Sequence, residues 1–171
     1  MALVAAVRRY STPAVAVLGL LLVACDSGSP ASGVGAAPPP PAVPAVRAAE
    51  FDAGPIKTAA EYLAEPELAA ANPARGELLS FACAACHQFR EKVTLIGPHL
   101  HGVFGRPAAT VEGFAYSPAL RESGLVWTPR SLEAWLADPS GFVEGTTMAF
   151  TGYRSAEDRR DLIAFLLRAT Q

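Results

Sequence analysis

The sequence CAACH, from Cys83 to His87, puts two thiols and an imidazole within five residues, and three kinds of chemistry use such a group. A structural zinc site would add His99 or His101, but zinc sites usually draw their ligands from two evenly spaced pairs. A redox dithiol would use the cysteines alone, and it normally opens a helix after a strand of a βαβ unit. The chain has neither a second pair nor a βαβ pattern, which disfavours both interpretations.

Covalent attachment of haem is the third chemistry, and Cys-x-x-Cys-His is its recognised pattern. Cys83 and Cys86 on a tight turn would reach two vinyl groups on one edge of the porphyrin, while the next residue directs its imidazole at the iron. Such haem is attached outside the cytoplasm, so export of the chain is expected as well. The sequence therefore predicts one covalently bound haem c, with His87 as an iron ligand.

The segments that must position this haem are predicted to be helical. Start and stop signals for three helices lie at Asn72-Pro73, Thr128-Pro129, Asp138-Pro139 and Ser155, which is expected to form a capping box with Asp158. Residues 58–71 also have helical character, but Pro66 makes them either a broken helix or a disordered extension. Long loops rich in Gly and Pro occupy residues 88–126 and 139–154, and such loops are unusual in a small domain unless something else fills its interior.

The first quarter of the chain is predicted to be a targeting signal. Arg8 and Arg9 precede an apolar run, residues 13–24, which is too short for a membrane-spanning helix of roughly 20 residues and fits a secretory signal. The run ends in Leu-Val-Ala-Cys, which resembles the lipobox of bacterial lipoproteins, with Cys25 as the acylated first residue of the mature chain. An ordinary signal peptide without lipidation is the alternative. Asp26 resembles a signal for retention on the inner membrane.

These features divide the chain into four predicted parts. Residues 1–24 are a lipoprotein signal peptide, and residues 25–49 are the lipidated Cys followed by a linker rich in Pro and Ala. Residues 50–71 are an acidic extension, helical or disordered, and residues 72–171 are the haem domain.

Residues 72–170 resemble class I cytochrome c along nearly their whole length. The segments GPHLHGVFGR, GFAYSPA, LVWTP, EGTTMAFTGY and DRRDLIAFL occur in that family's order. The resemblance implies an all-α cytochrome c fold, a small helical domain wrapped around one covalent haem with long loops. It also implies that the first and last helices of the domain cross closely at Gly76 and Phe165.

The resemblance also implies roles for individual residues. His87 becomes the proximal iron ligand, and the Pro98 carbonyl accepts a hydrogen bond from its imidazole. Met148 becomes the sixth ligand, and it is the only methionine left after signal removal; His99 and His101 are its rivals. Positions that contact the haem propionates in the family are occupied by Arg106, Tyr116, Trp127 and Thr146, although plain core packing is the alternative for the two aromatic residues.

Three positions near the sixth ligand depart from the family pattern. Glu144 replaces a proline, Trp135 replaces a tyrosine near the Met sulfur, and Leu120 replaces an asparagine. An indole donates a hydrogen bond but cannot accept one. We therefore expect the hydrogen bonding around Met148, and with it the reduction potential, to differ from the family norm.

The charge distribution bears on possible partners. Residues 72–171 contain ten basic and ten acidic residues, and a neutral domain gives no support for nucleic-acid binding. The lysine ring of mitochondrial relatives is largely absent, with Ser140, Gly141 and Thr147 in its place. Strong charge steering of redox partners is therefore not expected.

Together these patterns predict a monomeric, lipid-anchored monohaem electron carrier, not an enzyme, on the periplasmic face of a bacterial inner membrane. It would work between respiratory or photosynthetic complexes, such as a cytochrome bc-type complex as donor and a terminal oxidase as acceptor. Two alternatives remain open at this point. One is a haem peroxidase or ligand sensor with a labile Met ligand, and the other is an electron-relay subunit of a larger oxidoreductase.

Overall fold

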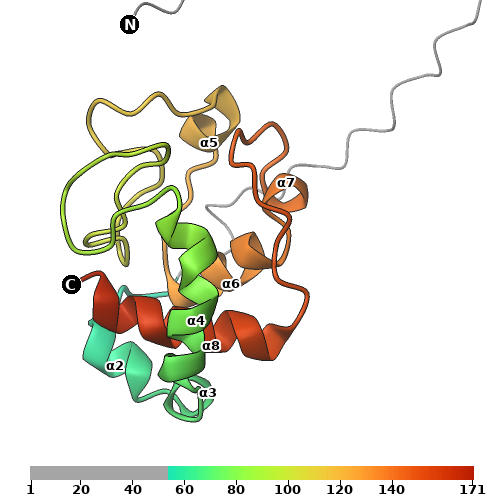
Figure 1. Ribbon diagram of the computed structural model, residues 1–171. Helices are drawn as coiled ribbons and strands as arrows, with labels where there is room; N and C mark the ends of the chain where they lie inside the picture. Colours follow the sequence, from blue (N-terminus) through green and yellow to red (C-terminus); the bar gives the residue numbers. More distant parts are fainter. Residues whose placement is uncertain (1–53) are drawn as a thin grey trace, which may run out of the picture. The chain divides into compact units, whose positions relative to one another are not determined.

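The computed structural model describes residues 54–171, which contain seven α-helices (Figure 1). Their bounds are Ala59–Leu63 (α2), Pro66–Ala69 (α3), Pro73–Ala84 (α4), Pro118–Glu122 (α5), Pro129–Ala137 (α6), Pro139–Phe142 (α7) and Ala156–Ala169 (α8). Strand-like pairing in this part of the chain is limited to two isolated bridges. The predicted all-α class is therefore confirmed, whereas the predicted signal peptide, Cys25 and the linker lie outside the described residues.

Five of these helices, α3 to α7, begin at a proline. α4 and α6 begin at Pro73 and Pro129, and α6 ends directly before Asp138, as the sequence signals predicted. The short helices α5 and α7, which were not predicted, interrupt the two long loops and begin at Pro118 and Pro139. A proline at the first helical position loses no intrahelical hydrogen bond, so the same local signal starts long and short helices alike.

The predicted capping box at the start of α8 is only half formed. Ser155 Oγ accepts a hydrogen bond from the Asp158 N–H at 3.2 Å, so Ser155 is the N-cap. The Asp158 carboxylate is directed instead at Arg75 of α4, with which it forms an ion pair. A charge-assisted bond between two helices has thus replaced the local return bond of the box.

The crossing of α4 and α8 is the foundation of the fold, and Figure 1 shows α4 running across α8. A Cβ added at Gly76 would lie 2.0 Å from the carbonyl oxygen of Asp161 and 2.9 Å from Cβ of Phe165, so the predicted close crossing at Gly76 and Phe165 is confirmed. The buried Asp161 carboxylate accepts a hydrogen bond from the Asn72 N–H at 2.7 Å. The start of α4 is therefore fixed to the middle of α8 by both packing and hydrogen bonding.

Residues 58–71 form a broken helix, the first of the two alternatives for this segment. α2 ends at Leu63, α3 begins at Pro66, and both helices contact α8. Tyr62 and Leu68 are 6% and 7% exposed and belong to the same buried cluster as the side chains of α8. The described part of the extension therefore packs into the same core as α8.

Candidate haem site

A cavity of about 240 Å³ is lined in part by residues of the buried cluster, and four parts of the chain supply most of its walls. The end of α4 and the CAACH turn form one wall, residues 96–117 a second, α6 a third, and residues 146–150 the fourth. All nine residues that the sequence predicted to hold the cofactor line this one cavity: Cys83, Cys86, His87, Pro98, Arg106, Tyr116, Trp127, Thr146 and Met148. Protein interiors rarely leave a space of this size between apolar side chains, which points to a large apolar occupant.

His87 leaves α4 on a tight turn. The N–H groups of Cys86 and His87 both donate to the Cys83 carbonyl, at 3.0 and 2.9 Å, which closes the helix and directs the imidazole away from it. Nδ1 of His87 lies 2.6 Å from the Pro98 carbonyl oxygen and must be the donor, because a carbonyl can only accept. Nε2 therefore carries the lone pair, which is the form that binds a metal.

Two further features favour the neutral imidazole in this orientation. Burial lowers the pKa of His87 below its ordinary value, so the ring stays uncharged at neutral pH. A Cβ added at Gly97 would lie only 2.4 Å from Cε1 of His87, so the backbone of this loop packs directly against the ring.

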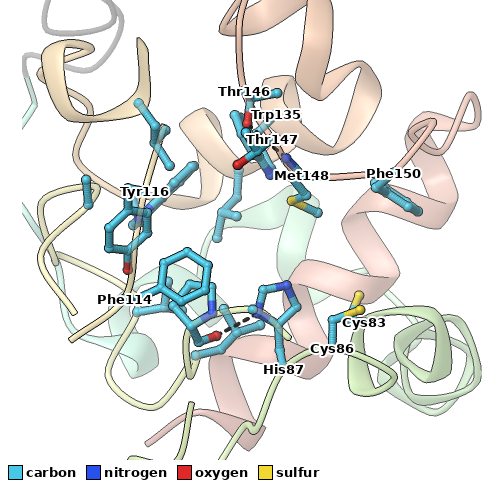
Figure 2. A pocket seen from close by; sticks show the side chains of 18 of the residues that line it. Cys83, Cys86, His87, Phe114, Tyr116, Trp135, Thr146, Thr147, Met148 and Phe150 are labelled. Atoms are coloured by element: carbon cyan, nitrogen blue, oxygen red, sulfur yellow. Dashed lines mark hydrogen bonds between the residues drawn. The ribbon is translucent and has the colours of Figure 1, made fainter. Parts of the chain in front are cut away.

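The two thiols lie beside the imidazole, as Figure 2 shows for Cys83 and Cys86. Both are free and partly buried, and burial raises the pKa of the Cys83 thiol to about 11. A redox dithiol depends on a lowered thiol pKa, so this environment is the reverse of what that alternative requires. Among residues 54–171 no group of three or more His, Cys, Asp or Glu side chains is arranged to hold a metal ion by itself.

Met148 lies across the cavity from His87, and the two side chains extend towards each other from opposite walls (Figure 2). Its own N–H has a long hydrogen bond of 3.4 Å to Thr146 Oγ1, and its carbonyl accepts from the Phe150 N–H at 3.0 Å. The rivals His99 and His101 do not line the cavity. His87 would therefore offer an imidazole nitrogen, and Met148 a thioether sulfur, to the iron of a group bound between the two walls.

Polar side chains collect at the end of the cavity near Arg106. Its guanidinium donates to the carbonyl oxygens of His101 and His99, at 2.8 and 3.0 Å, and burial lowers its pKa. Burial raises the pKa of the nearby Tyr116 hydroxyl, which therefore remains a neutral donor. A positive charge and a donor at one end of an apolar cavity suit the carboxylates of a haem.

Aromatic side chains line part of the cavity, and one of them, Phe114, was not singled out from the sequence. Trp127 packs edge to face on Trp135 with ring centroids 5.3 Å apart, so both indoles belong to one aromatic wall. Phe114 packs in the same way on Tyr116, at 4.6 Å. The spacing of Phe114 and Tyr116 in an extended segment could have identified Phe114, because alternate side chains there lie on one face.

The cavity therefore fits a haem: its walls are mostly apolar, two free thiols lie beside a neutral imidazole, and a thioether faces that imidazole. Among residues 54–171, no helix has both the length and the apolar character needed to cross a membrane.

Comparison with known proteins finds several cytochromes c among the relatives of this chain. The chain is 48% identical over 71 residues to a cytochrome c of Trypanosoma brucei brucei, a match that covers 42% of this chain and 76% of that protein. It is 42% identical over 95 residues to a cytochrome c of Stellaria longipes, covering 55% of this chain and 88% of the relative. A bacterial relative, the cytochrome c-type cyt cy of Rhodobacter capsulatus, is 46% identical over 90 residues, covering 53% of this chain and 45% of the relative. No family model matches the chain.

These identities extend over more than two thirds of two of the relatives, and the helical fold and the cavity agree with them. The chain therefore belongs to the cytochrome c family, whose members are electron carriers with one covalently bound haem c.

Proposed function

We propose that this chain is a monohaem electron carrier tethered to the periplasmic face of a bacterial inner membrane through Cys25. One observation carries the part of this proposal that concerns the site: the nine predicted cofactor residues line a single cavity, with His87 and Met148 on opposite walls. When bound, the haem supplies a one-electron couple between ferrous and ferric iron.

Each side chain has a separate task in this proposal. Cys83 and Cys86 hold the cofactor by thioether bonds, and Pro98 fixes the orientation of the His87 ring through its carbonyl. Met148, as the ligand opposite His87, raises the reduction potential relative to a site with two histidines. Arg106 and Tyr116, with Trp127 and Thr146, are proposed to bind the propionates.

The mouth of the cavity supports a docking mode that depends little on charge. Four cavity-lining residues are exposed, namely Ala82, Ile96, Thr147 and Ala149, and none of them is charged. Ile96 is 78% exposed, an unusual position for a large apolar side chain. Partners such as a cytochrome bc-type complex and a terminal oxidase would then meet an uncharged rim, and long-range charge steering would contribute little to the encounter.

The proposed tether compensates for weak steering. The lipobox-like sequence before Cys25 supports acylation, and the similarity to a bacterial cytochrome cy supports a periplasmic setting. A linker of residues 25–49 would hold the domain within tens of ångströms of membrane partners, and this raises its effective concentration.

The tether and the cofactor can be tested together in a bacterial host that matures c-type haem. The wild-type chain should sediment with the membranes, and the mass of the mature protein should equal residues 25–171 plus one haem and acyl chains. Cys25→Ala should move the haem protein to the soluble periplasmic fraction with an unchanged visible spectrum, because the haem cavity lies within the described domain.

Ser27→Ala is the matched control, since it changes a small polar residue two positions away and should remain with the membranes. A Cys25→Ala protein that still sediments, or a wild-type mass without acyl chains, would contradict the tether. A mass without haem would contradict the assigned cofactor residues.

A further inference from the structure

The loop that carries Met148 is fastened to the rest of the fold mainly after the methionine. Tyr153, five residues beyond Met148, donates its N–H to the carbonyl of Leu136 in α6 at 2.7 Å. Its hydroxyl donates to the carbonyl of Leu79 in α4, also at 2.7 Å. One residue thereby connects this loop to two helices that form different walls of the cavity.

The hydrogen bond to α4 lies close to the predicted haem-attachment cysteines. Leu79 lies four residues, about one helical turn, before Cys83, the first predicted attachment thiol. The Tyr153 hydroxyl therefore links the loop of the sixth ligand to the turn of α4 that leads into the CAACH segment. A fixed separation between these two segments is what a group held by both of them requires.

Neighbouring contacts make Tyr153 a rigid anchor. Arg159 of α8 donates to the carbonyl oxygens of Tyr153 and Arg154, at 2.7 and 2.9 Å, and its Nε donates to Glu133 of α6 at 2.8 Å. The Tyr153 ring also packs edge to face on Phe150, with centroids 5.2 Å apart. Phe150 is only two residues from Met148, so a displacement of Tyr153 would be transmitted directly towards the methionine.

We propose that Tyr153 is a positioning residue for Met148, whose hydroxyl bond to α4 holds the methionine loop at the distance that iron coordination needs. The proposal rests on the proposed role of Met148 as the sixth ligand. Tyr153 does not line the cavity and is not proposed to touch the haem. It acts through the loop, by lowering the free energy of the arrangement in which Met148 faces His87 relative to arrangements in which the loop has moved away.

Tyr153→Phe tests this with the smallest possible change, because it removes the hydroxyl and keeps the ring that packs on Phe150. Tyr62→Phe is the matched control. The Tyr62 hydroxyl also has one hydrogen bond to the backbone, accepting from the Lys57 N–H at 3.3 Å, but it belongs to α2 and not to the methionine loop. Both variants lose one hydroxyl contact, and only one of them loses a contact to the loop of Met148.

The measurement is competition by free imidazole in the ferric holoprotein, followed by the weak far-red absorption band that marks methionine coordination. A single hydrogen bond contributes enough to change this equilibrium about five-fold. Tyr153→Phe should therefore lower the imidazole concentration at half displacement by about five-fold, whereas Tyr62→Phe should leave it within about two-fold of wild type. Equal displacement curves for the two variants would overturn the proposal, because Tyr153 would then be merely structural.

A second variant keeps the test independent of how well Tyr153→Phe folds. Glu133→Gln weakens the partner of Arg159 and should change the displacement curve in the same direction by about two-fold. No change in Glu133→Gln, combined with failure of Tyr153→Phe to fold, would also count against the proposal. A wild-type protein that lacks the far-red band would overturn the ligand role of Met148 itself, which separates that failure from the failure of the positioning role.

Discussion

The loop that presents His87 and the loop that presents Met148 face each other across one cavity, but different kinds of contact hold them. On the histidine side, backbone bonds join the CAACH turn to the following loop: Gly97 N–H to the Cys86 carbonyl at 2.9 Å, and Leu100 N–H to the Gln88 carbonyl at 2.7 Å. The Pro98 carbonyl then fixes the imidazole itself at 2.6 Å. On the methionine side, the bonds of Met148 stay within its own loop, at 3.4 Å to Thr146 and 3.0 Å from the Phe150 N–H. The hydrogen bonds from this loop to other helices begin at Tyr153.

One small domain can therefore hold one predicted ligand firmly and leave the position of the other dependent on distant contacts. The orientation of His87 is built into the backbone of its loop before any cofactor is considered. Met148 is positioned from a distance, through the end of its loop. The histidine side should therefore determine whether haem is held at all, and the methionine side should determine the strength of the sixth bond.

The largest difference between the two sides is expected when each predicted ligand is removed in turn. His87→Ala should lower the yield of haem protein at least about ten-fold, because it removes the predicted iron ligand together with the hydrogen bond to the Pro98 carbonyl that orients it. Met148→Ala should retain covalent haem through Cys83 and Cys86 and lose only the far-red band. Haem staining of denatured protein and the ferric spectrum measure both effects, and equal yields for the two variants would contradict the asymmetry.

The next largest effect is expected from glycine substitutions on the two sides. Gly97→Ala places a Cβ 2.4 Å from the His87 ring, and overpacking of this kind typically costs about 1–3 kcal/mol of unfolding free energy. Gly145→Ala is its counterpart on the methionine side, where φ is +88° and the nearest atom, Cβ of Ala119, is 3.3 Å away. We expect a cost of about 1 kcal/mol there, mainly from backbone strain.

Denaturant unfolding of the ferric holoproteins measures both costs. The spectrum adds a second distinction, because Gly97→Ala should also disturb the iron site whereas Gly145→Ala should not. A Gly145→Ala protein less stable than Gly97→Ala would contradict the expected order of the two unfolding costs.

The smallest expected effect is the contribution of the Tyr153 hydroxyl to the unfolding free energy at alkaline pH. Burial raises the pKa of the Tyr153 hydroxyl, with smaller contributions from Cys83 and Asp158. The fold thus favours the neutral hydroxyl, and its contribution to stability is complete below the ordinary tyrosine pKa of about 10. As pH rises further the unfolded chain releases this proton first, so the contribution is lost.

The unfolding free energy of wild type should therefore fall more steeply above pH 10 than that of Tyr153→Phe. Groups common to both proteins, such as Tyr116, cancel in this difference. Parallel pH profiles for wild type and Tyr153→Phe would show that the fold does not favour the neutral form of the Tyr153 hydroxyl.

The sequence was most informative where a short local pattern carries the signal. CAACH and the family-like segments pointed to nine residues that the structure brings together around one cavity, and X-Pro signals located the starts of α4 and α6. What escaped prediction depends on contacts between distant segments. The pairing of Asp158 with Arg75 replaced a local capping bond, and the burial of Tyr62 becomes evident only when α2 lies on α8. Tyr153 is the last residue of the segment EGTTMAFTGY, but its hydrogen bond to Leu79 spans 74 residues and could not be predicted from that segment.

The most direct test of the central claim follows the methyl group of Met148 in protein labelled with carbon-13 at the methionine methyl carbons. The chain contains two methionines, Met1 and Met148, and the first would be lost if the predicted signal peptide is cleaved. In the ferrous holoprotein, a methyl group held over the porphyrin by iron coordination experiences the ring current and shifts strongly upfield. We predict one such resonance, which disappears in Met148→Ala. A Met148 methyl resonance at its ordinary position in haem-loaded protein would contradict the proposed pairing of His87 and Met148 across the cavity.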